Sequence, residues 1–396
     1  MLAKHSPFSF VHRDRSLLIF ILVAIFALSA CGQAAPTPTN QTQTQPTSQL
    51  ATINQDGVLT PRQPRTALTL QGDGASFPAP LYQSWIVTYK KAVPNLTIGY
   101  QSTGSGQGIK DFSNGLTDFG ATDAFMNDEE LKAVPDTLHI PMVLGAVVVI
   151  YNLNGIRTLK LSPETLTGVY RGVIKTWNDP AIVADNQGIA LPSTPIVVVY
   201  RSDGSGTTSI FTSYLSSVNP EWKSAVGSGT TVKWPIGSGA PKNDGVAAFV
   251  AKTPGSIGYV EQIYAFAQKP PLPVAALRNA AGAFVLPDEA SIAAAADSFS
   301  TQMPQDLRIS IVNPPGRQDA YPISGFTYIL VHKQMADQTK AEALTEFLYW
   351  SLTSATPLAQ SLKYVPLPET VRKRAIQLLT EISSNGQPVL RIPNTK

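Results

Sequence analysis

The stretch Arg201-Ser202-Asp203-Gly204-Ser205-Gly206-Thr207-Thr208 lies between two apolar segments of different periodicity. Residues 195–200 form a continuous apolar run typical of a buried strand, and residues 209–215 carry apolar side chains at helical spacing. The first N–H groups of a helix have no intrahelical partner and carry partial positive charge, so anions bind there. The order of strand, Gly/Ser/Thr turn and helix therefore predicts an oxyanion site at residues 201–208.

The side chains of this turn fit the same prediction. Gly204 and Gly206 allow the backbone to approach an oxyanion closely, and Ser205 and Thr207 add hydroxyl donors. Arg201 supplies a permanent positive charge at the end of the strand. An ordinary capped turn with a surface arginine is the alternative. A phosphate loop of the Walker A type is excluded, because no Gly-Lys-Ser/Thr sequence closes the turn.

The composition is that of a globular protein. The chain has 396 residues, of which 43% are apolar and 14% charged, and this length is enough for two domains with substantial cores. The formal net charge is +3, and Lys4, Arg13 and Arg15 against Asp14 place +2 of it near the N-terminus. The rest of the chain is near neutral, which argues against nucleic acid as a partner.

The N-terminus predicts export and lipid attachment. Basic residues precede the apolar run 17–28, which is too short to span a membrane comfortably as a permanent helix. The run ends in Leu28-Ser29-Ala30-Cys31, which resembles a bacterial lipobox, so we expect a lipoprotein signal peptide over residues 1–30 and a lipidated Cys31. An ordinary signal peptide with an incidental cysteine is the alternative. Cys31 is the only cysteine, so no internal disulfide can form.

Residues 31–66 are predicted to be a flexible linker that follows the lipidated cysteine. Thr, Gln, Pro and Asn dominate this segment, and it has few apolar side chains to bury. Acyl chains on Cys31 would anchor the folded body to the extracytoplasmic face of the cell membrane without a spanning segment.

A pattern of strand, glycine-rich turn and helix recurs in the folded body. Strand 68–71 leads into the turn 72–78, strand 97–101 leads into the turn 102–108, and a third strand over 118–121 ends at Thr122-Asp123. In open α/β sheets, ligands bind at the carboxyl ends of the strands. The pattern therefore predicts an α/β fold whose binding site gathers these turns with Arg201.

Several separated segments resemble the periplasmic-type phosphate-binding proteins of bacterial high-affinity phosphate ABC transporters. The matching segments are Gly-Asp-Gly-Ala-Ser-Phe-Pro-Ala-Pro at 72–80, Asp-Phe-Gly-Ala-Thr-Asp at 118–123, Arg-Ser-Asp-Gly-Ser-Gly-Thr at 201–207, Val-Lys-Trp-Pro-Ile-Gly at 232–237, Asn-Asp-Gly-Val at 243–246 and Gly-Ser-Ile-Gly-Tyr-Val-Glu at 255–261. The resemblance extends from about Leu70 to Leu379.

The resemblance implies a two-lobed periplasmic-binding-protein fold of type II, with two α/β domains joined by a hinge that closes on the ligand. It implies that residues 67–151 plus 322–384 form lobe 1, that the insertion 152–321 forms lobe 2, and that residues 385–396 are a C-terminal tail. Tyr151-Asn152 and Tyr321-Pro322 lie at the edges of apolar strands, where the chain is expected to cross between the lobes.

By the same resemblance, the phosphate-binding residues are Ser76, Phe77, Ser105, Asp123, Arg201, Asp203, Ser205, Gly206 and Thr207. Phe77 is expected to contribute its backbone N–H rather than its ring. Ser76 stands where the family commonly has Thr, so the hydroxyl is kept. Asp203 is expected to hold Arg201, with capping of the helix at Gly206 as the alternative. The sequence after Ser105 varies from the family pattern, which leaves the donors of residues 106–107 open.

Asp123 needs a separate explanation, because it is an acceptor in a site otherwise built from donors. A carboxylate beside a dianion is repulsive unless a proton lies between them. Phosphate at neutral pH carries a proton and sulfate does not, so Asp123 would accept a hydrogen bond from phosphate and reject sulfate, with a discrimination of roughly 10⁴–10⁵. The alternative role for Asp123 is to cap a helix after the strand.

The resemblance implies a non-enzymatic lipoprotein that binds inorganic phosphate one-to-one and delivers it to the membrane permease of an ABC transporter. We expect a monomer with no cofactor, no metal and no catalytic residue. The alternatives are a phosphate-scavenging or sensing lipoprotein and a hydrolase of phosphate esters. Against the hydrolase, no histidine is near a motif: His5 and His12 precede the cleavage site, while His139 and His332 lie in apolar strands. Asp123 argues against sulfate or molybdate as the ligand.

Overall fold

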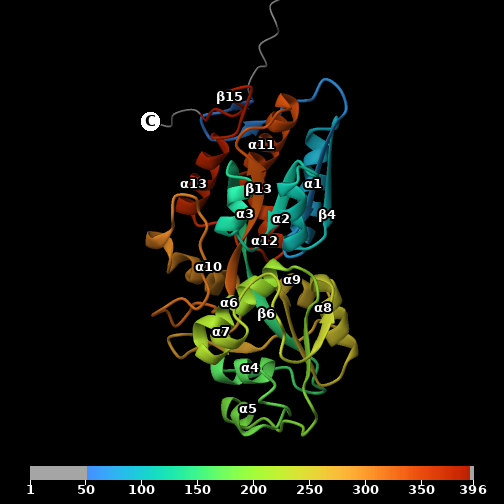
Figure 1. The fold of residues 1–396 in the computed structure, drawn as a ribbon, viewed down its shortest axis with the longest axis vertical. Helices are drawn as coiled ribbons and strands as arrows, with labels where there is room; N and C mark the ends of the chain where they lie inside the picture. Colours follow the sequence, from blue (N-terminus) through green and yellow to red (C-terminus); the bar gives the residue numbers. More distant parts are fainter. Residues whose placement is uncertain (1–50, 393–396) are drawn as a thin grey trace, which may run out of the picture. The chain divides into compact units, whose positions relative to one another are not determined.

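The computed structural model describes residues 51–392. The predicted signal peptide, Cys31 and the first part of the predicted linker therefore lie outside the described residues. The described chain mixes helices and strands throughout its length (Figure 1). Among the helices of residues 51–392, none is both long and apolar enough to cross a membrane.

One sheet of eight strands organises the fold. In spatial order these strands are β4 (Leu96–Ser102), β3 (Leu68–Gly74), β5 (Phe119–Thr122), β13 (Ser324–His332), β6 (Thr137–Tyr151), β10 (Ser256–Glu261), β8 (Val197–Arg201) and β9 (Ser238–Ala240). β3 is parallel to β4 and β5, and β8 is parallel to β9 and β10. β6 and β13 run antiparallel to their neighbours, so they form an antiparallel centre between two parallel groups.

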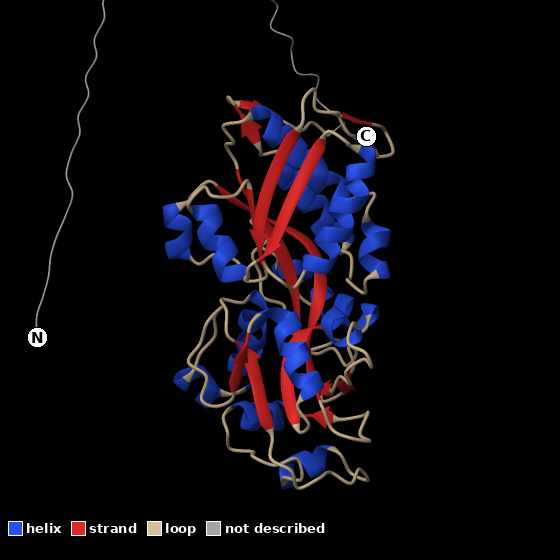
Figure 2. Cartoon of the chain, turned by 90° about the vertical axis from the view of Figure 1, so that its right-hand side faces the viewer, coloured by secondary structure: helices blue, strands red, loops and turns tan. Residues whose placement is uncertain are grey.

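The long strand β6 runs through both halves of this sheet. Its part up to Ala146 pairs with β13, and its part from Val147 onward pairs with β10. Every residue of β6 after Thr137 is buried, as the continuous apolar run at 143–151 predicts. The changeover at Ala146–Val147 divides the sheet into a first lobe built on β3, β4, β5 and β13 and a second lobe built on β8, β9 and β10 (Figure 2).

Helices cover the sheet in both lobes. The first lobe carries α1 (Ala79–Ala92), α2 (Ser105–Ser113), α3 (Asp128–Ala133), α11 (Gln338–Leu352), α12 (Thr356–Ser361) and α13 (Glu369–Leu379). The second lobe carries α4 (Pro163–Tyr170), α5 (Pro180–Asp185), α6 (Gly206–Val218), α7 (Pro220–Ala225), α8 (Lys242–Lys252) and α9 (Gln262–Phe266). The chain then returns to β13 through α10 (Glu289–Asp297) and the short 3₁₀ helix η1 (Ser300–Gln302).

Five of the six second-lobe helices begin where a polar side chain accepts from a free backbone N–H group. The capping residues of α4, α5, α6, α7 and α9 are Ser162, Asp179, Ser205, Asn219 and Glu261. A smaller sheet of β12 (Phe284–Val285), β11 (Ala276–Arg278) and β7 (Lys160–Leu161) lies in the same part of the chain. These strands are too short to leave a periodic signal in the sequence.

The linker predicted to reach residue 66 is wrong for its described part, residues 51–66. β1 (Thr52–Ile53) pairs with β2 (Leu59–Thr60), and Ile53 and Leu59 are buried in the main core. Arg62 forms ion pairs with Glu342 at 2.9 Å and with Glu346 at 2.5 Å on α11. A few apolar side chains and one cation are thus enough to attach this polar segment to the folded body.

The predicted C-terminal tail also packs on the body in its described part. β15 (Gln387–Pro388) pairs with β14 (Ser383–Ser384), and the Val389 and Leu390 side chains that follow are buried. The four residues after Ile392 lie outside the described residues.

Candidate functional site

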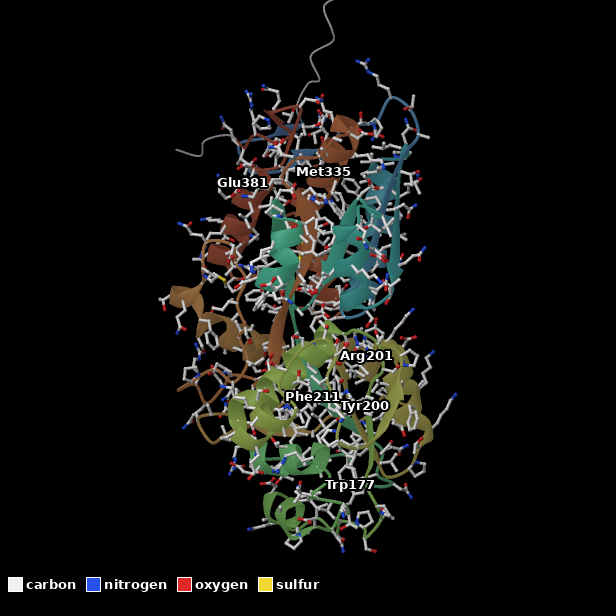
Figure 3. All side chains as sticks on the ribbon, in the orientation of Figure 1. Trp177, Tyr200, Arg201, Phe211, Met335 and Glu381 are labelled. Carbon is white, nitrogen blue, oxygen red and sulfur yellow. The ribbon has the colours of Figure 1, made fainter. Side chains whose placement is uncertain are left out.

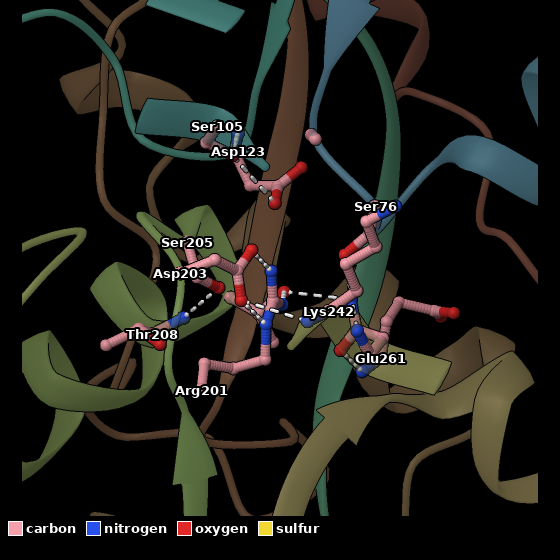
Figure 4. Close-up of polar contacts among 12 residues, drawn as sticks. Ser76, Ser105, Asp123, Arg201, Asp203, Ser205, Thr208, Lys242 and Glu261 are labelled. Atoms are coloured by element: carbon pink, nitrogen blue, oxygen red, sulfur yellow. Dashed lines mark hydrogen bonds and ion pairs between the residues drawn. The ribbon is translucent and has the colours of Figure 1, made fainter. Parts of the chain in front are cut away.

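The three predicted turns meet where the two lobes face each other. Ser76 and Ser105 follow β3 and β4 of the first lobe, Asp123 follows β5, and residues 201–208 join β8 to α6 of the second lobe (Figure 4). The backbone N–H of Gly106 donates to the carbonyl oxygen of Gly204 at 2.9 Å, which links the two lobes directly. The carboxyl ends of the parallel strands in both lobes therefore form one site.

Gly206 lies directly against the first lobe at this site. A Cβ atom at this position would lie 2.6 Å from Asp123 Oδ2 and 2.6 Å from Ser105 Oγ, closer than real Cβ contacts. Only glycine fits, because the start of α6 lies directly against the end of β5 and the start of α2. The helix N-terminus thus points its free N–H groups at the space that Asp123 and Ser105 border.

Arg201 is buried at the end of β8, on the side of the second lobe nearest the first lobe (Figure 3). Its Nε donates to Asp203 Oδ1 at 2.8 Å, its Nη2 donates to Asp203 Oδ2 at 2.6 Å, and its Nη1 donates to Thr207 Oγ1 at 3.3 Å. The side chain of Arg201 is only 1% exposed, so the alternative of a surface arginine is wrong. The two-point contact fixes the plane of the guanidinium.

Asp203 serves Arg201 and not the helix that follows. Burial acts to raise the pKa of Asp203, but the hydrogen bonds and charge of Arg201 and the backbone N–H of Lys242, which donates at 2.9 Å, lower it overall. The cap of α6 is Ser205, whose Oγ accepts from the Thr208 N–H at 3.0 Å. The alternative of Asp203 as a cap at Gly206 is therefore wrong.

The junction of β8 and α6 rests on a buried tyrosine. The Tyr259 hydroxyl accepts from the Arg201 N–H at 3.2 Å and lies 2.6 Å from Thr208 Oγ1. The Tyr259 ring stacks on Phe211 of α6 with 4.2 Å between ring centroids. The Tyr259 side chain of β10 therefore contacts both the strand and the helix that flank the turn, and the turn packs on the protein core.

The predicted donors of the first lobe are buried at the same place. Ser105 is the first residue of α2, and its Oγ accepts from the Asp123 N–H at 3.3 Å. Ser76 lies in the turn between β3 and α1 with 2% of its surface exposed. The Phe77 ring is fully buried against Gly145, as expected for a residue whose ring belongs to the core.

The donors of residues 106–107, left open by the sequence, can now be placed. The Gly106 N–H is used in the contact with Gly204. The Gln107 side chain donates to Asp111 at 2.8 Å at an exposed position. The Gly106 N–H is thus used in the contact between the lobes, and the Gln107 side chain bonds outside the candidate site.

Asp123 is the acceptor among these donors. It is 5% exposed, its Oδ2 lies 3.4 Å from Ser105 Oγ, and its Oδ1 has no hydrogen-bond partner within the described part of the chain. Burial raises the pKa of Asp123 to about 7, although the nearby Thr327 hydroxyl and the Arg201 charge act in the opposite direction. The helix after β5 is α3, which Asn127 caps, so the alternative of Asp123 as a helix cap is wrong.

Asn243, near the start of α8, is a site residue that the sequence analysis missed. It is fully buried, and its Nδ2 donates to Ser76 Oγ at 3.0 Å and to Thr207 Oγ1 at 3.2 Å. Its Oδ1 accepts from the Glu261 N–H at 2.9 Å. The signal was its place inside the matching segment 243–246, but a match of this kind assigns no partner to the side chain.

Glu261 is a second buried polar residue beside the site. Its Oε2 accepts from the Ile263 N–H at 2.9 Å, and its Oε1 has no hydrogen-bond partner among residues 51–392. Burial raises the pKa of Glu261 well above its usual value.

The two described histidines bond elsewhere. His139 accepts from the Met126 N–H at 3.0 Å, and burial lowers its pKa to about 3. His332 pairs with Asp136 at 3.0 Å and stacks on Phe112. Across residues 51–392, no group of three or more His, Cys, Asp and Glu side chains has an arrangement that could hold a metal ion.

Known proteins resemble this chain over most of its length. The profile of a PBP superfamily domain matches residues 36–355. The phosphate-binding protein PstS of Pasteurella multocida (strain Pm70) is 43% identical over 327 residues, which cover 82% of this chain and 94% of that protein. The phosphate-binding protein PstS of Methanocaldococcus jannaschii is 40% identical over 342 residues, which cover 80% of this chain and 87% of that protein.

Solved structures show the same fold. The phosphate-binding protein from Stenotrophomonas maltophilia superposes with a TM-score of 0.62 at 20% identity, over 78% of this chain and 93% of that chain. A high-affinity periplasmic phosphate-binding protein solved with bound phosphate also gives a TM-score of 0.62, at 24% identity. The predicted two-lobed α/β fold is confirmed. The chain belongs to the PBP superfamily and, within it, to the family of the phosphate-binding proteins PstS.

Proposed function

We propose that this chain captures inorganic phosphate between its two lobes and delivers it to the membrane permease of an ABC transporter. The observation that carries the proposal is the buried Asp123 carboxyl, which faces the start of α6 and is surrounded by donors. The relatives named phosphate-binding proteins support the same ligand. Lobe closure would accompany binding, because donors from both lobes meet at this point.

The donors proposed for the phosphate oxygens come from both lobes. They are the hydroxyls of Ser76, Ser105, Ser205 and Thr207, the backbone N–H groups of Phe77, Gly206 and Thr207, and the guanidinium of Arg201. Asp203 would act only through Arg201, which it holds in one orientation. A charge-assisted contact from a fixed, buried guanidinium is the strongest single attraction of this set.

Selectivity would come from the one acceptor. Phosphate near neutral pH still has a P–OH group that can donate to Asp123, whereas fully ionised sulfate would place an oxygen lone pair against the carboxylate. Since Asp123 is almost fully buried, water cannot relieve that repulsion. With Asp123 ionised, the site should therefore prefer phosphate over sulfate by roughly 10⁴–10⁵.

We propose a binding protein and not a phosphate-ester hydrolase. The hydroxyls of Ser76 and Ser205 accept hydrogen bonds from N–H groups of Asn243 and Thr208. A serine nucleophile is most often activated by a histidine base, and His139 and His332 bond elsewhere.

The lobes we propose are residues 67–151 plus 322–384 and residues 152–321. The pairing of β6 supports this division, because its partner changes from β13 to β10 at Ala146–Val147. The return crossing would precede β13, which begins at Ser324.

We also propose that Cys31 is lipidated and holds the protein, as a monomer, on the extracytoplasmic face of the membrane. The lipobox-like sequence Leu28-Ser29-Ala30-Cys31 supports this. Cys31→Ser should move the protein from the membrane fraction to the soluble extracytoplasmic fraction in the expressing bacterium. Equal retention of both forms in the membrane fraction would refute lipid anchoring at this residue.

Isothermal titration calorimetry of the full chain in detergent, with phosphate, arsenate and sulfate, tests the proposed ligand. At about pH 8, where Asp123 is mostly ionised, we expect one-to-one binding of phosphate and of arsenate, which carries the same proton, and much weaker binding of sulfate. Sulfate heat comparable to that of phosphate would refute the role of Asp123. We expect no turnover of a chromogenic phosphate ester by the wild type. Turnover that is lost in Ser205→Ala would instead support the hydrolase.

A further inference from the structure

Asn243 joins two proposed phosphate ligands that belong to different lobes. Its Nδ2 lies 3.0 Å from Ser76 Oγ, in the first lobe, and 3.2 Å from Thr207 Oγ1, in the second lobe. The Asn243 backbone N–H also points to Ser76 Oγ, at 3.4 Å. Asn243 therefore fixes the distance between two hydroxyls that come together only when the lobes meet.

The orientation of the Asn243 amide follows from its third contact. Its Oδ1 faces the backbone N–H of Glu261 at 2.9 Å, and a backbone N–H can only donate. The oxygen must therefore point to Glu261, and the NH₂ group must point to Ser76 and Thr207. With the amide turned the other way, its NH₂ group would face the Glu261 N–H, and two donors would oppose each other. The positions of the Asn243 oxygen and nitrogen are therefore assigned without any assumption about the Ser76 and Thr207 hydroxyls.

This orientation decides where the hydroxyl protons go. A hydroxyl has one proton to donate and two lone pairs to accept with. Thr207 Oγ1 accepts from both Asn243 Nδ2 and Arg201 Nη1, and Ser76 Oγ accepts from two N–H groups of Asn243. Since their lone pairs are taken up by donors, both hydroxyls must give their protons to a different acceptor.

We propose that Asn243 is a positioning residue that turns the Ser76 and Thr207 protons toward a bound oxyanion, one from each lobe. The proposal rests on the proposed function, in which phosphate is that oxyanion. Asn is suited to this role and Asp is not. An Asp side chain would accept from both hydroxyls, remove their protons from the ligand and place a second carboxylate in an anion site.

Asn243→Ala in the full chain, titrated with inorganic phosphate by calorimetry, tests the proposal. Two hydroxyl donors to an anion lose their orientation, so we expect phosphate to bind roughly 10- to 100-fold more weakly. Asn186→Ala is the matched control. Asn186 is also buried in the second lobe, donating to the carbonyls of Lys160 and Ile182 and accepting from the Lys160 N–H, but it touches no proposed ligand. Phosphate affinity of the control should equal that of the wild type.

A double-mutant cycle separates positioning from a general loss of structure. When Ser76→Ala and Thr207→Val have removed the hydroxyls, Asn243→Ala should weaken phosphate binding by less than about threefold more. A further loss as large as in the wild-type background would overturn the proposal, and so would wild-type affinity in Asn243→Ala.

If Asn243→Ala does not fold, Asn243→Asp replaces it. Asp keeps the acceptor for the Glu261 N–H but reverses the hydrogen bonds to both hydroxyls, so we expect at least as large a loss of phosphate affinity; unchanged affinity would overturn the proposal. Wild-type protein that binds no phosphate would refute the proposed function and this inference together. Wild-type binding with an unaffected Asn243 variant would refute the inference alone.

Discussion

Replacing Asp123 with Asn tests the basis of the proposed selectivity. Asn keeps the shape of the side chain but replaces one acceptor oxygen with a donor NH₂ group. In the wild type with Asp123 ionised, a discrimination of roughly 10⁴–10⁵ corresponds to about 5.5–7 kcal/mol between phosphate and sulfate. Asp123 is 5% exposed and its Oδ1 lacks a partner among the described residues. The side chain at position 123, and not a water molecule, therefore contacts the ligand.

The expected magnitudes follow from the change in hydrogen bonding. Phosphate loses one charge-assisted hydrogen bond, worth about 1.5–3 kcal/mol, and should bind roughly 10- to 100-fold more weakly to Asp123→Asn. Sulfate exchanges a repulsive acceptor for a donor and should become a measurable ligand. The preference for phosphate should therefore fall by on the order of 10²–10⁴.

Calorimetric titrations of Asp123→Asn and of Asp73→Asn with both anions measure this effect. Asp73 is a suitable control because it is also buried and burial also raises its pKa, to about 6, but it accepts from Thr103 and is outside the proposed donor set. The control should keep the wild-type preference. An unchanged ratio of phosphate to sulfate affinity in Asp123→Asn would refute the reasoning.

The pH dependence gives a second test of the same residue. Because burial raises the pKa of Asp123 to about 7, the carboxyl is mostly protonated at about pH 5 and mostly ionised at about pH 8. A protonated carboxyl can donate to sulfate, so the preference for phosphate should be smaller at about pH 5 than at about pH 8. The same preference at both values would contradict the assignment.

Three further predictions concern other residues. Arg201→Ala should weaken phosphate binding by about 2–5 kcal/mol in calorimetry, whereas Arg278→Ala, which removes an exposed arginine, should not. Gly206→Ala should weaken phosphate binding roughly 10- to 100-fold, because a Cβ at this position has no room between the lobes. Gly229→Ala is the control and should bind phosphate normally, because a Cβ there would lie 3.5 Å from the nearest atom. Glu261→Gln should raise the free energy of unfolding above that of the wild type at about pH 8. The pKa of Glu261 in the wild type is raised by burial, so the wild-type folded state loses stability as pH rises through that pKa. The stability advantage of Glu261→Gln should therefore vanish below about pH 4.5, where Glu261 is protonated in the folded and unfolded states, and denaturant titrations measure this.

Much of the fold follows from local sequence. The continuous apolar run over 143–151 is the second half of β6, and the predicted helical periodicity over 209–215 lies in α6. Both signals depend on side chains close together in the chain, which is why the sequence shows them. The linker was wrong over residues 51–66 for the opposite reason, since Ile53, Leu59 and Arg62 find their partners in distant helices and in the core.

The candidate site shows the same division more sharply. The residue types of an anion site, with Arg201 at a strand end and hydroxyls at a helix start, are visible in the sequence, because strand and helix ends expose backbone groups in a fixed direction. The role of Asn243 is not visible there, because its three partners lie in two other turns and on β10.

The sequence by itself determined the longer helices and strands that show a clear periodicity, the donor-rich turns and the family. Only the tertiary structure decided that Gly206 meets Asp123 and Ser105, that Asp203 holds Arg201 while Ser205 caps the helix, and that Asn243 bridges the lobes. Periodicity and capping act over one or two helical turns, whereas these contacts join residues tens to hundreds of positions apart. Their geometry is fixed by how β6 carries the chain from one lobe to the other.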